Sequence, residues 1–207
     1  KALREEGCTD VTFIGNLVRP AFRDLRFDWS AVRLLPRILN GLRGGDDHIL
    51  SATARVFEDG GFRVLGVRDL APDLLMPSGC LTRTQPDAAS LADAVKGREV
   101  LQAISPFDVG QAVVVIDGHV VSVEDIEGTD ALLARIKRLR ENGRLRAKPG
   151  RGVLVKAPKQ GQDLRLDLPA LGPQTIRGLA EAGLAGLAVA AGHSVVAEPQ
   201  AMIEAAD

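Results

Sequence analysis

Residues 111–124 constrain the fold most strongly, because they hold two β-rich runs joined by a turn sequence. The runs are Gln111–Ile116 and His119–Glu124, and Asp117-Gly118 stands between them. An Asp-Gly pair suits a tight hairpin turn, since that turn needs positive φ angles that these residues tolerate. We therefore predict an antiparallel hairpin.

Helical and extended patterns alternate along the chain, which is typical of an α/β fold with a mixed sheet. The predicted helices cover residues 30–43, a stripe over residues 49–57 that stops at Gly60-Gly61, residues 88–104, 129–139 and 173–182, and a segment that starts at Pro199. Further strands are predicted at residues 11–15, 62–66, 152–156 and 184–189, with 193–198 paired beside the last. We expect Leu91, Val95 and Leu101 to face the core, and Thr129 or Asp130 to cap the helix after the hairpin.

Composition describes an ordinary globular protein. The 207 residues are 45% apolar, enough for a core, and the net charge is −1. With six Phe, one Trp and no Tyr, the chain lacks the aromatic and basic surface of a nucleic-acid-binding protein. No apolar run is long enough to cross a bilayer.

Several enzyme classes are excluded by missing motifs. The sequence has no phosphate-binding P-loop, GxGxxG, GxSxG or HExxH pattern. Cys8 and Cys80 lack metal-binding spacing, and a reduced cytoplasmic setting is the default for them. The chain opens on Lys1–Gly7, a helical pattern without an initiator methionine, so we expect an N-terminal portion to precede it.

The segment from Lys156 to Pro169 carries the most informative chemistry. If residues 162–168 are extended, Asp163, Arg165 and Asp167 share one edge and the leucines between them face the other way. Carboxylates hold hard cations such as Mg²⁺, and Arg and Lys hold phosphate oxygens. This edge, with Lys156 and Lys159 upstream, predicts cleavage of a phosphate or diphosphate bond. A half-buried strand with a salt-bridged polar face would show the same alternation.

Other polar residues are candidates for substrate contact. Asn16 and Arg19 follow the first predicted strand, where an α/β sheet commonly binds ligands; alternatively, Asn16 makes the turn. A basic run follows the hairpin and suits contact with phosphates or an anionic membrane surface, or else it is a solvated helix face and loop. The run comprises Arg135, Lys137, Arg138, Arg140, Arg144, Arg146, Lys148 and Arg151.

Several motifs together resemble the UDP-2,3-diacylglucosamine pyrophosphatases of lipid A biosynthesis, of the LpxI type. The motifs are Asp108–Val115, Glu127–Arg135, Gly152–Pro169, Gly44 with Asp46 and Asp47, Phe62, and Ala182–Gly186. The resemblance implies that residues 1–40 are the C-terminal remnant of a Rossmann-like domain with a linker helix. It further implies that residues 41–207 form a distinct α/β domain and that substrate lies between the two domains.

The same resemblance implies the reaction. The diphosphate of UDP-2,3-diacylglucosamine is hydrolysed with Mg²⁺, which gives UMP and 2,3-diacylglucosamine 1-phosphate (lipid X). Asp167 matches the catalytic carboxylate and either ligates Mg²⁺ or orients water, and Asp163 is a second candidate. Expected substrate contacts are Asn16, Arg19, Gln111, Glu127, Thr129, Asp130, Lys156, Lys159 and Arg165. A cytoplasmic homodimer in peripheral contact with the inner membrane is also implied.

Two other functions remain open at this point. One alternative to the pyrophosphatase is a non-catalytic module that binds nucleotide sugars or lipid phosphates. The other is a metal phosphatase that acts on small soluble esters. Substrate binding without product would favour the module, and activity on simple phosphate esters would favour the phosphatase.

Overall fold

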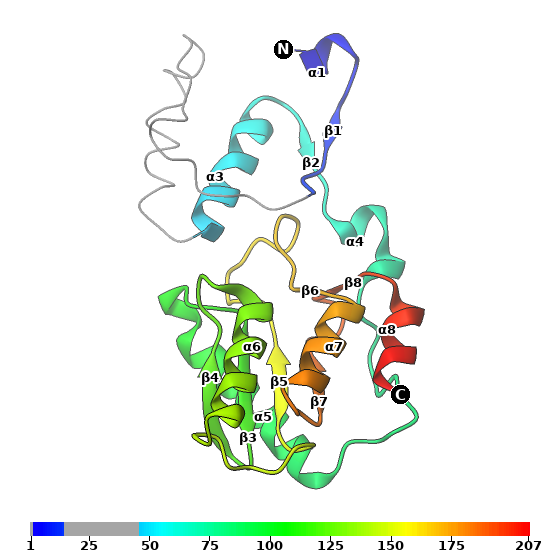
Figure 1. Ribbon diagram of the computed structural model, residues 1–207. Coiled ribbons are helices and arrows are strands. Elements are labelled where there is room, and N and C mark those ends of the chain that lie inside the picture. The colour runs from blue at the N-terminus through cyan, green and yellow to red at the C-terminus, as the bar shows by residue number, and fades with distance from the viewer. Residues whose placement is uncertain (1, 15–45) are drawn as a thin grey trace. The chain divides into compact units, whose positions relative to one another are not determined.

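The computed structural model describes residues 2–14 and 46–207 and divides the chain into two units (Figure 1). The first unit comprises Lys1–Pro72 and the short segment Gln162–Asp167, and the second comprises Asp73–Gly161 and Leu168–Asp207. Asn16, Arg19, the predicted helix 30–43 and the predicted domain boundary at residue 40 lie outside the described residues.

The first unit is built around one long helix and a small parallel sheet. Its elements are α1 (Ala2–Glu5), β1 (Asp10–Val11), α3 (Asp46–Asp59), β2 (Arg63–Val64) and α4 (Val67–Leu70). Strands β1 and β2 pair in parallel. On α3, the ring of Phe57 packs edge-on against Phe13 and Phe62, with centroids 5.2 and 6.0 Å away. The predicted buried strand 11–15 is wrong in extent, since β1 ends at Val11 and Ile14 is 91% exposed.

The second unit contains a mixed four-stranded sheet. Its elements are η2 (Pro72–Leu74, which straddles the division), α5 (Ala88–Ile104), η3 (Ser105–Phe107), β3 (Ala112–Ile116), β4 (His119–Val123), α6 (Gly128–Glu141), β5 (Val153–Lys156), β6 (Ala170–Leu171), α7 (Pro173–Glu181), β7 (Gly186–Val189), β8 (Val195–Val196) and α8 (Pro199–Ala206). The sheet order is β4-β3-β5-β7. Strand β3 is antiparallel to both neighbours, and β5 and β7 are parallel, which confirms the predicted mixed sheet.

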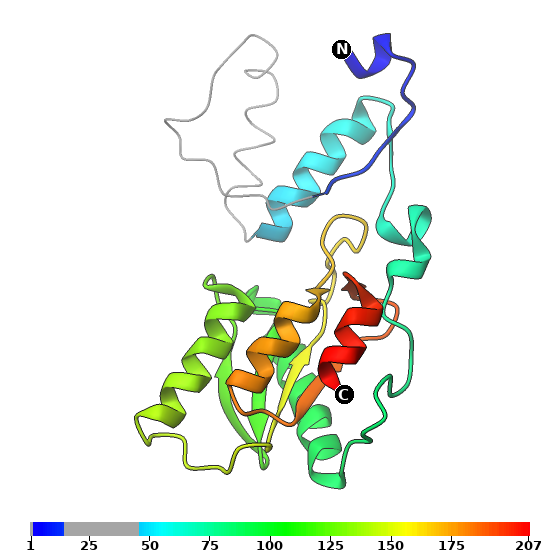
Figure 2. The same cartoon turned by 45° about the vertical axis from the view of Figure 1, so that its right-hand side comes forward.

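Helices cover both faces of this sheet. Helices α6 and α7 lie on one face and α5 on the other, and α8 lies beside α7 (Figures 1 and 2). Alternate residues of β3 therefore enter different cores: Val114 packs with Leu132 and Leu133, and Val113 packs with Leu101. Double coverage explains why β3 reads as a continuous apolar run.

The predicted hairpin is confirmed and is held by a buried carboxylate. The turn residues Asp117 and Gly118 have φ angles of 51° and 75°, the region in which glycine is least strained. Their backbone N–H groups donate to the two oxygens of Asp93, at 2.9 and 2.6 Å. Asp93 lies on α5 and is only 2% exposed. The turn is thus fixed from outside the hairpin as well as by its own sequence.

The two hydrogen bonds to Asp93 explain why α5 buries a different face from the one predicted. Asp93, Gly97 and Leu101 are its buried residues, spaced at one helical turn. The expectation that Leu91 and Val95 face the core is wrong, since their exposed fractions are 53% and 50%. A polar residue occupies the inward position because the hairpin supplies its hydrogen-bond donors.

Two further predictions about strands are wrong. Residues 162–168 do not form an extended edge: Leu164–Leu166 form a turn. Within the segment 193–198, strand β8 pairs in parallel with β6 in a separate two-stranded sheet and not beside β7. Within the described residues, no helix is both long and apolar enough to cross a membrane.

Candidate functional site

Asp163 builds the turn that carries the predicted catalytic residues. Its carbonyl accepts from the backbone N–H of Leu166 (2.9 Å) and Asp167 (3.2 Å), and its side chain accepts from the N–H of Arg165 (3.1 Å). An Asp that bonds the backbone two residues ahead favours a turn over a strand. The local side chain therefore overrides the alternating pattern.

Arg165 ties this turn to the rest of the first unit. Its Nε and Nη2 donate to the two oxygens of Asp163 at 3.0 and 2.7 Å, and its Nη1 donates to Glu58 on α3 at 2.7 Å. The Arg165 bonds hold the pKa of Asp163 below its usual value, and Asp163 and then Glu58 raise the pKa of Arg165. A side chain at Gly66 would not fit, because its Cβ would lie 2.6 Å from the Arg165 Cα.

Through these bonds, Asp163 and Arg165 stabilise the turn. Both oxygens of Asp163 are engaged by one guanidinium, and three guanidinium nitrogens are engaged by two carboxylates. A bidentate pair of this kind fixes geometry as well as charge. The structure thus accounts for these two residues without a substrate.

Asp167 is held differently. It is half-buried, and its Oδ2 accepts from Nε2 of the buried Gln162 at 2.5 Å. The same Gln162 nitrogen donates to the Asp167 carbonyl at 3.0 Å. The Gln162 amide therefore fixes the direction of one oxygen of the Asp167 carboxylate.

Mg²⁺ fits a site built on Asp167 only if most ligands come from elsewhere. Among the described residues, no group of three or more His, Cys, Asp or Glu is arranged to hold a metal ion. Mg²⁺ is commonly bound by one or two carboxylates together with waters and substrate phosphates. Asp167 meets that requirement as a single oriented carboxylate.

A second polar cluster lies in the second unit, where β5 ends. Lys156 is 7% exposed and donates from Nζ to Thr129 Oγ1 at 2.8 Å. Thr129 in turn donates to Glu124 Oε1, and Glu124 Oε2 accepts from the backbone N–H of Gln111 at 2.8 Å. The structure thus brings together three predicted residues, Gln111, Thr129 and Lys156, around a Glu that the sequence analysis did not single out.

Lys159 follows this cluster in the chain and is also engaged. It forms an ion pair with Asp108, which has a positive φ of 51°. The next residue, Gln160, donates its N–H to the buried Ser105 Oγ at 2.6 Å. Both bonds attach the start of the loop to the segment that precedes β3.

The remaining candidates of the second unit lie at the start of α6. Glu127 pairs with Arg135 at 2.7 Å and stands at the N-cap position without a side-chain cap bond, and Asp130 is exposed. The prediction that Thr129 or Asp130 caps this helix is wrong, because the helix begins at Gly128 and Thr129 bonds Glu124 instead.

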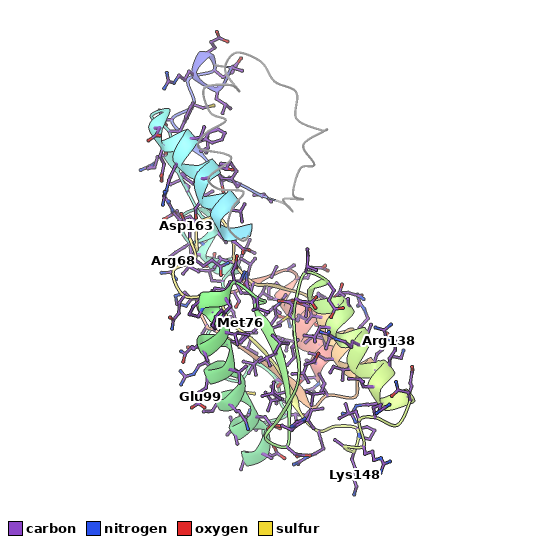
Figure 3. All side chains as sticks on the ribbon, turned by 90° about the vertical axis from the view of Figure 1, so that its left-hand side faces the viewer. Arg68, Met76, Glu99, Arg138, Lys148 and Asp163 are labelled. Carbon is purple, nitrogen blue, oxygen red and sulfur yellow. The ribbon has the colours of Figure 1, made fainter. Side chains whose placement is uncertain are left out.

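About half of the basic run is engaged in the fold. Arg140 donates to the carbonyls of Ala182 (2.8 Å) and Gly183 (3.1 Å), and Arg151 pairs with Asp117. Lys137 and Arg135 also form ion pairs with acidic residues. The exposed remainder comprises Arg138, Arg144, Arg146 and Lys148. Arg138 and Lys148 point outward from α6 and the loop after it (Figure 3).

The sequence did not reveal Glu124 and Gln162 as candidate site residues, because each matters through the hydrogen bonds it makes while buried. Glu124 is 9% exposed and Gln162 is 8% exposed. Glu124 does stand where a β-rich run ends, a position from which polar groups commonly reach a site, but nothing in the sequence separates it from Asp125 or Glu127.

Comparison with known proteins gives a consistent picture. A model of the LpxI N-terminal domain matches residues 1–74 and a model of the LpxI C-terminal domain matches residues 77–207. The junction between the two matches lies near the division of the fold at Pro72. The UDP-2,3-diacylglucosamine pyrophosphatase LpxI of Caulobacter vibrioides is 42% identical over 207 residues, which are all of this chain and 74% of that protein. The chain therefore belongs to the LpxI family.

Proposed function

We propose that this protein hydrolyses the diphosphate bond of UDP-2,3-diacylglucosamine and releases UMP and 2,3-diacylglucosamine 1-phosphate. The observation that carries the proposal is the identity of 42% along the whole chain to a relative named as that pyrophosphatase. Matches to both LpxI domains support it, because they cover nearly all of the 207 residues.

Asp167 is the proposed catalytic carboxylate. The Gln162 bond supports this role, since it holds one carboxylate oxygen at 2.5 Å in a fixed direction. Bound Mg²⁺ would screen the diphosphate charge and polarise a phosphoryl oxygen. Asp167 would hold that ion or orient the attacking water. Asp163 is the weaker candidate, because Arg165 occupies both of its oxygens.

Substrate binding is assigned to the basic and polar groups. Lys156 is the main candidate, because its ammonium can donate to phosphate oxygens, and Thr129 contributes by accepting from that ammonium at 2.8 Å. Lys159 is a further cation in the same unit. The remaining proposed contacts are Asn16, Arg19, Gln111, Glu127, Asp130 and Arg165.

The substrate's acyl chains suggest where the protein works. We expect a cytoplasmic homodimer in peripheral contact with the inner membrane. The exposed residues Arg138, Arg144, Arg146 and Lys148 support membrane contact, because anionic lipid headgroups attract clustered cations.

The test is release of UMP from UDP-2,3-diacylglucosamine by the intact chain with and without Mg²⁺. Magnesium-dependent release of UMP is the expected result. Tight substrate binding without product would identify a binding module, and turnover of simple phosphate esters alone would identify a general phosphatase. Either result would replace the proposed function.

A further inference from the structure

A one-way chain of hydrogen bonds joins a buried ammonium to a buried carboxylate in the second unit. Lys156 donates to Thr129 at 2.8 Å, and Thr129 donates to Glu124. A hydroxyl has a single proton, so a Thr129 oxygen that accepts from Lys156 can give that proton only to Glu124. The direction of each bond is therefore fixed by the chemistry of its two ends.

Glu124 is itself held firmly. Its second oxygen accepts from the Gln111 N–H at 2.8 Å, and its own N–H donates to the Ala112 carbonyl at 2.8 Å. Lys156 pairs with Ala112 across β3 and β5. The backbone of Glu124 and the backbone of Lys156 are thus both positioned beside Ala112, at the start of β3.

We propose that Glu124 is a positioning residue, which aims the Lys156 ammonium at a substrate phosphate oxygen through the Thr129 hydroxyl. The inference rests on the proposed function. A buried cation is costly unless a carboxylate compensates it, and Glu124 supplies that charge at 9% exposure. Held in one direction, the ammonium binds an incoming anion with little loss of side-chain entropy.

We refer to the hydrogen-bond chain from Lys156 through Thr129 to Glu124 as the relay. Glu124→Gln and Thr129→Val each break the relay at a different bond. The amide of Gln offers one acceptor and one donor group, so it cannot accept from the Gln111 N–H and the Thr129 hydroxyl on separate atoms. Valine keeps the shape of Thr129 and removes its hydroxyl. Thr129→Ser is the matched control, because it keeps the hydroxyl and removes only a methyl group.

The experiment is a double-mutant cycle on UMP release by the full chain, with kcat, KM and the unfolding midpoint measured for each variant. Each single variant should raise KM roughly tenfold or more, which corresponds to about 1.4 kcal/mol, with kcat within about threefold. The double variant should be no worse than the poorer single variant, because both act through one relay. Thr129→Ser should recover most of the rise in KM that Thr129→Val causes, because it restores the hydroxyl.

Independent effects that multiply in the double variant would overturn the inference. A lowered unfolding midpoint with an unchanged KM would also overturn it, since that is the result of a purely structural role. An inactive parent protein would instead refute the proposed function and leave the relay to a second measurement.

That measurement is the NMR signal of the Lys156 ammonium, assigned by its loss in Lys156→Arg. The signal should shift or exchange faster with solvent in Glu124→Gln and in Thr129→Val, and remain in place in Thr129→Ser. An unchanged Lys156 signal in both relay variants would contradict the inference whether or not the protein is active.

Discussion

Arg165 donates to both carboxylate oxygens of Asp163, from Nε at 3.0 Å and from Nη2 at 2.7 Å. The two residues are neighbours on the turn that also carries Asp167. The same Asp163 also accepts from the backbone N–H groups of Arg165, Leu166 and Asp167, which explains why an alternating sequence folds into a turn here. The bidentate pair thus shapes the segment that holds the proposed catalytic carboxylate.

The Asp163 pair should make stability depend on pH in the acid range. Its pKa is lowered in the folded protein, mainly by the Arg165 hydrogen bonds, so its contribution is present above the unfolded pKa of about 4. That contribution is lost as the pH falls through the lower, folded pKa. Asp163→Asn should therefore reduce the free energy of unfolding by up to about 1 kcal/mol at neutral pH.

Urea unfolding of the parent and Asp163→Asn between neutral and acid pH provides the measurement. The difference between the two proteins should shrink as the pH falls below about 4, because the parent then loses the same charge. A difference that is constant across this range would show that the ion pair does not stabilise the turn.

Removal of the Asp93 carboxylate should weaken the hairpin. Asp93→Ala leaves the N–H groups of Asp117 and Gly118 without their acceptor, at a cost of about 2–4 kcal/mol. Glu99→Ala on the same helix is the matched control, because Glu99 is exposed and points away from the sheet (Figure 3). Thermal unfolding should show a large drop for the first variant and little change for the second; equal drops would reject the role of Asp93.

The exposed basic residues should govern any binding to anionic lipid. Replacement of Arg138, Arg144, Arg146 and Lys148 by Gln removes four exposed charges. At about 1 kcal/mol for each charge, partitioning onto phosphatidylglycerol vesicles should fall roughly a thousandfold. The unfolding midpoint should not change.

Lys137→Gln is the control for this experiment, because Lys137 already pairs with Glu181 at 3.0 Å. It should reduce vesicle binding much less than the removal of an exposed cation. Unchanged vesicle binding in the fourfold variant would exclude this surface as the membrane contact.

Local chemistry decided which parts of the fold the sequence could predict. The hairpin was predictable because Asp117-Gly118 specifies its own turn. Helix α5 was predicted at its observed bounds, and the structure shows that Asp87 caps it by accepting from the Ser90 N–H at 2.7 Å. The turn at Leu164–Leu166 was missed because the alternating residues also fit a strand, although the Asp163 side chain accepts from the Arg165 N–H. The bond from Arg165 to Glu58, a residue 107 positions away, was not predictable either. Such a contact leaves no local pattern.

The candidate site shows the same limit. Thr129 and Lys156 were chosen for their residue types, which the sequence shows directly. Glu124 could not be chosen in this way. It bonds Thr129 because the chain enters α6 shortly after it, and it lies near the end of β5 because β3 pairs with β5. Its value depends on burial, and burial is a property of the fold.

The most direct test of the account is UMP release by Asp167→Asn beside Asp163→Asn, at saturating Mg²⁺ and substrate. Asp167→Asn keeps the shape of the side chain and removes its charge, so the rate should fall roughly a thousandfold. Asp163→Asn should keep the rate within about tenfold, because Arg165 already occupies that carboxylate. Near-parental UMP release by Asp167→Asn, with the activity lost in Asp163→Asn, would contradict the assignment of the catalytic carboxylate.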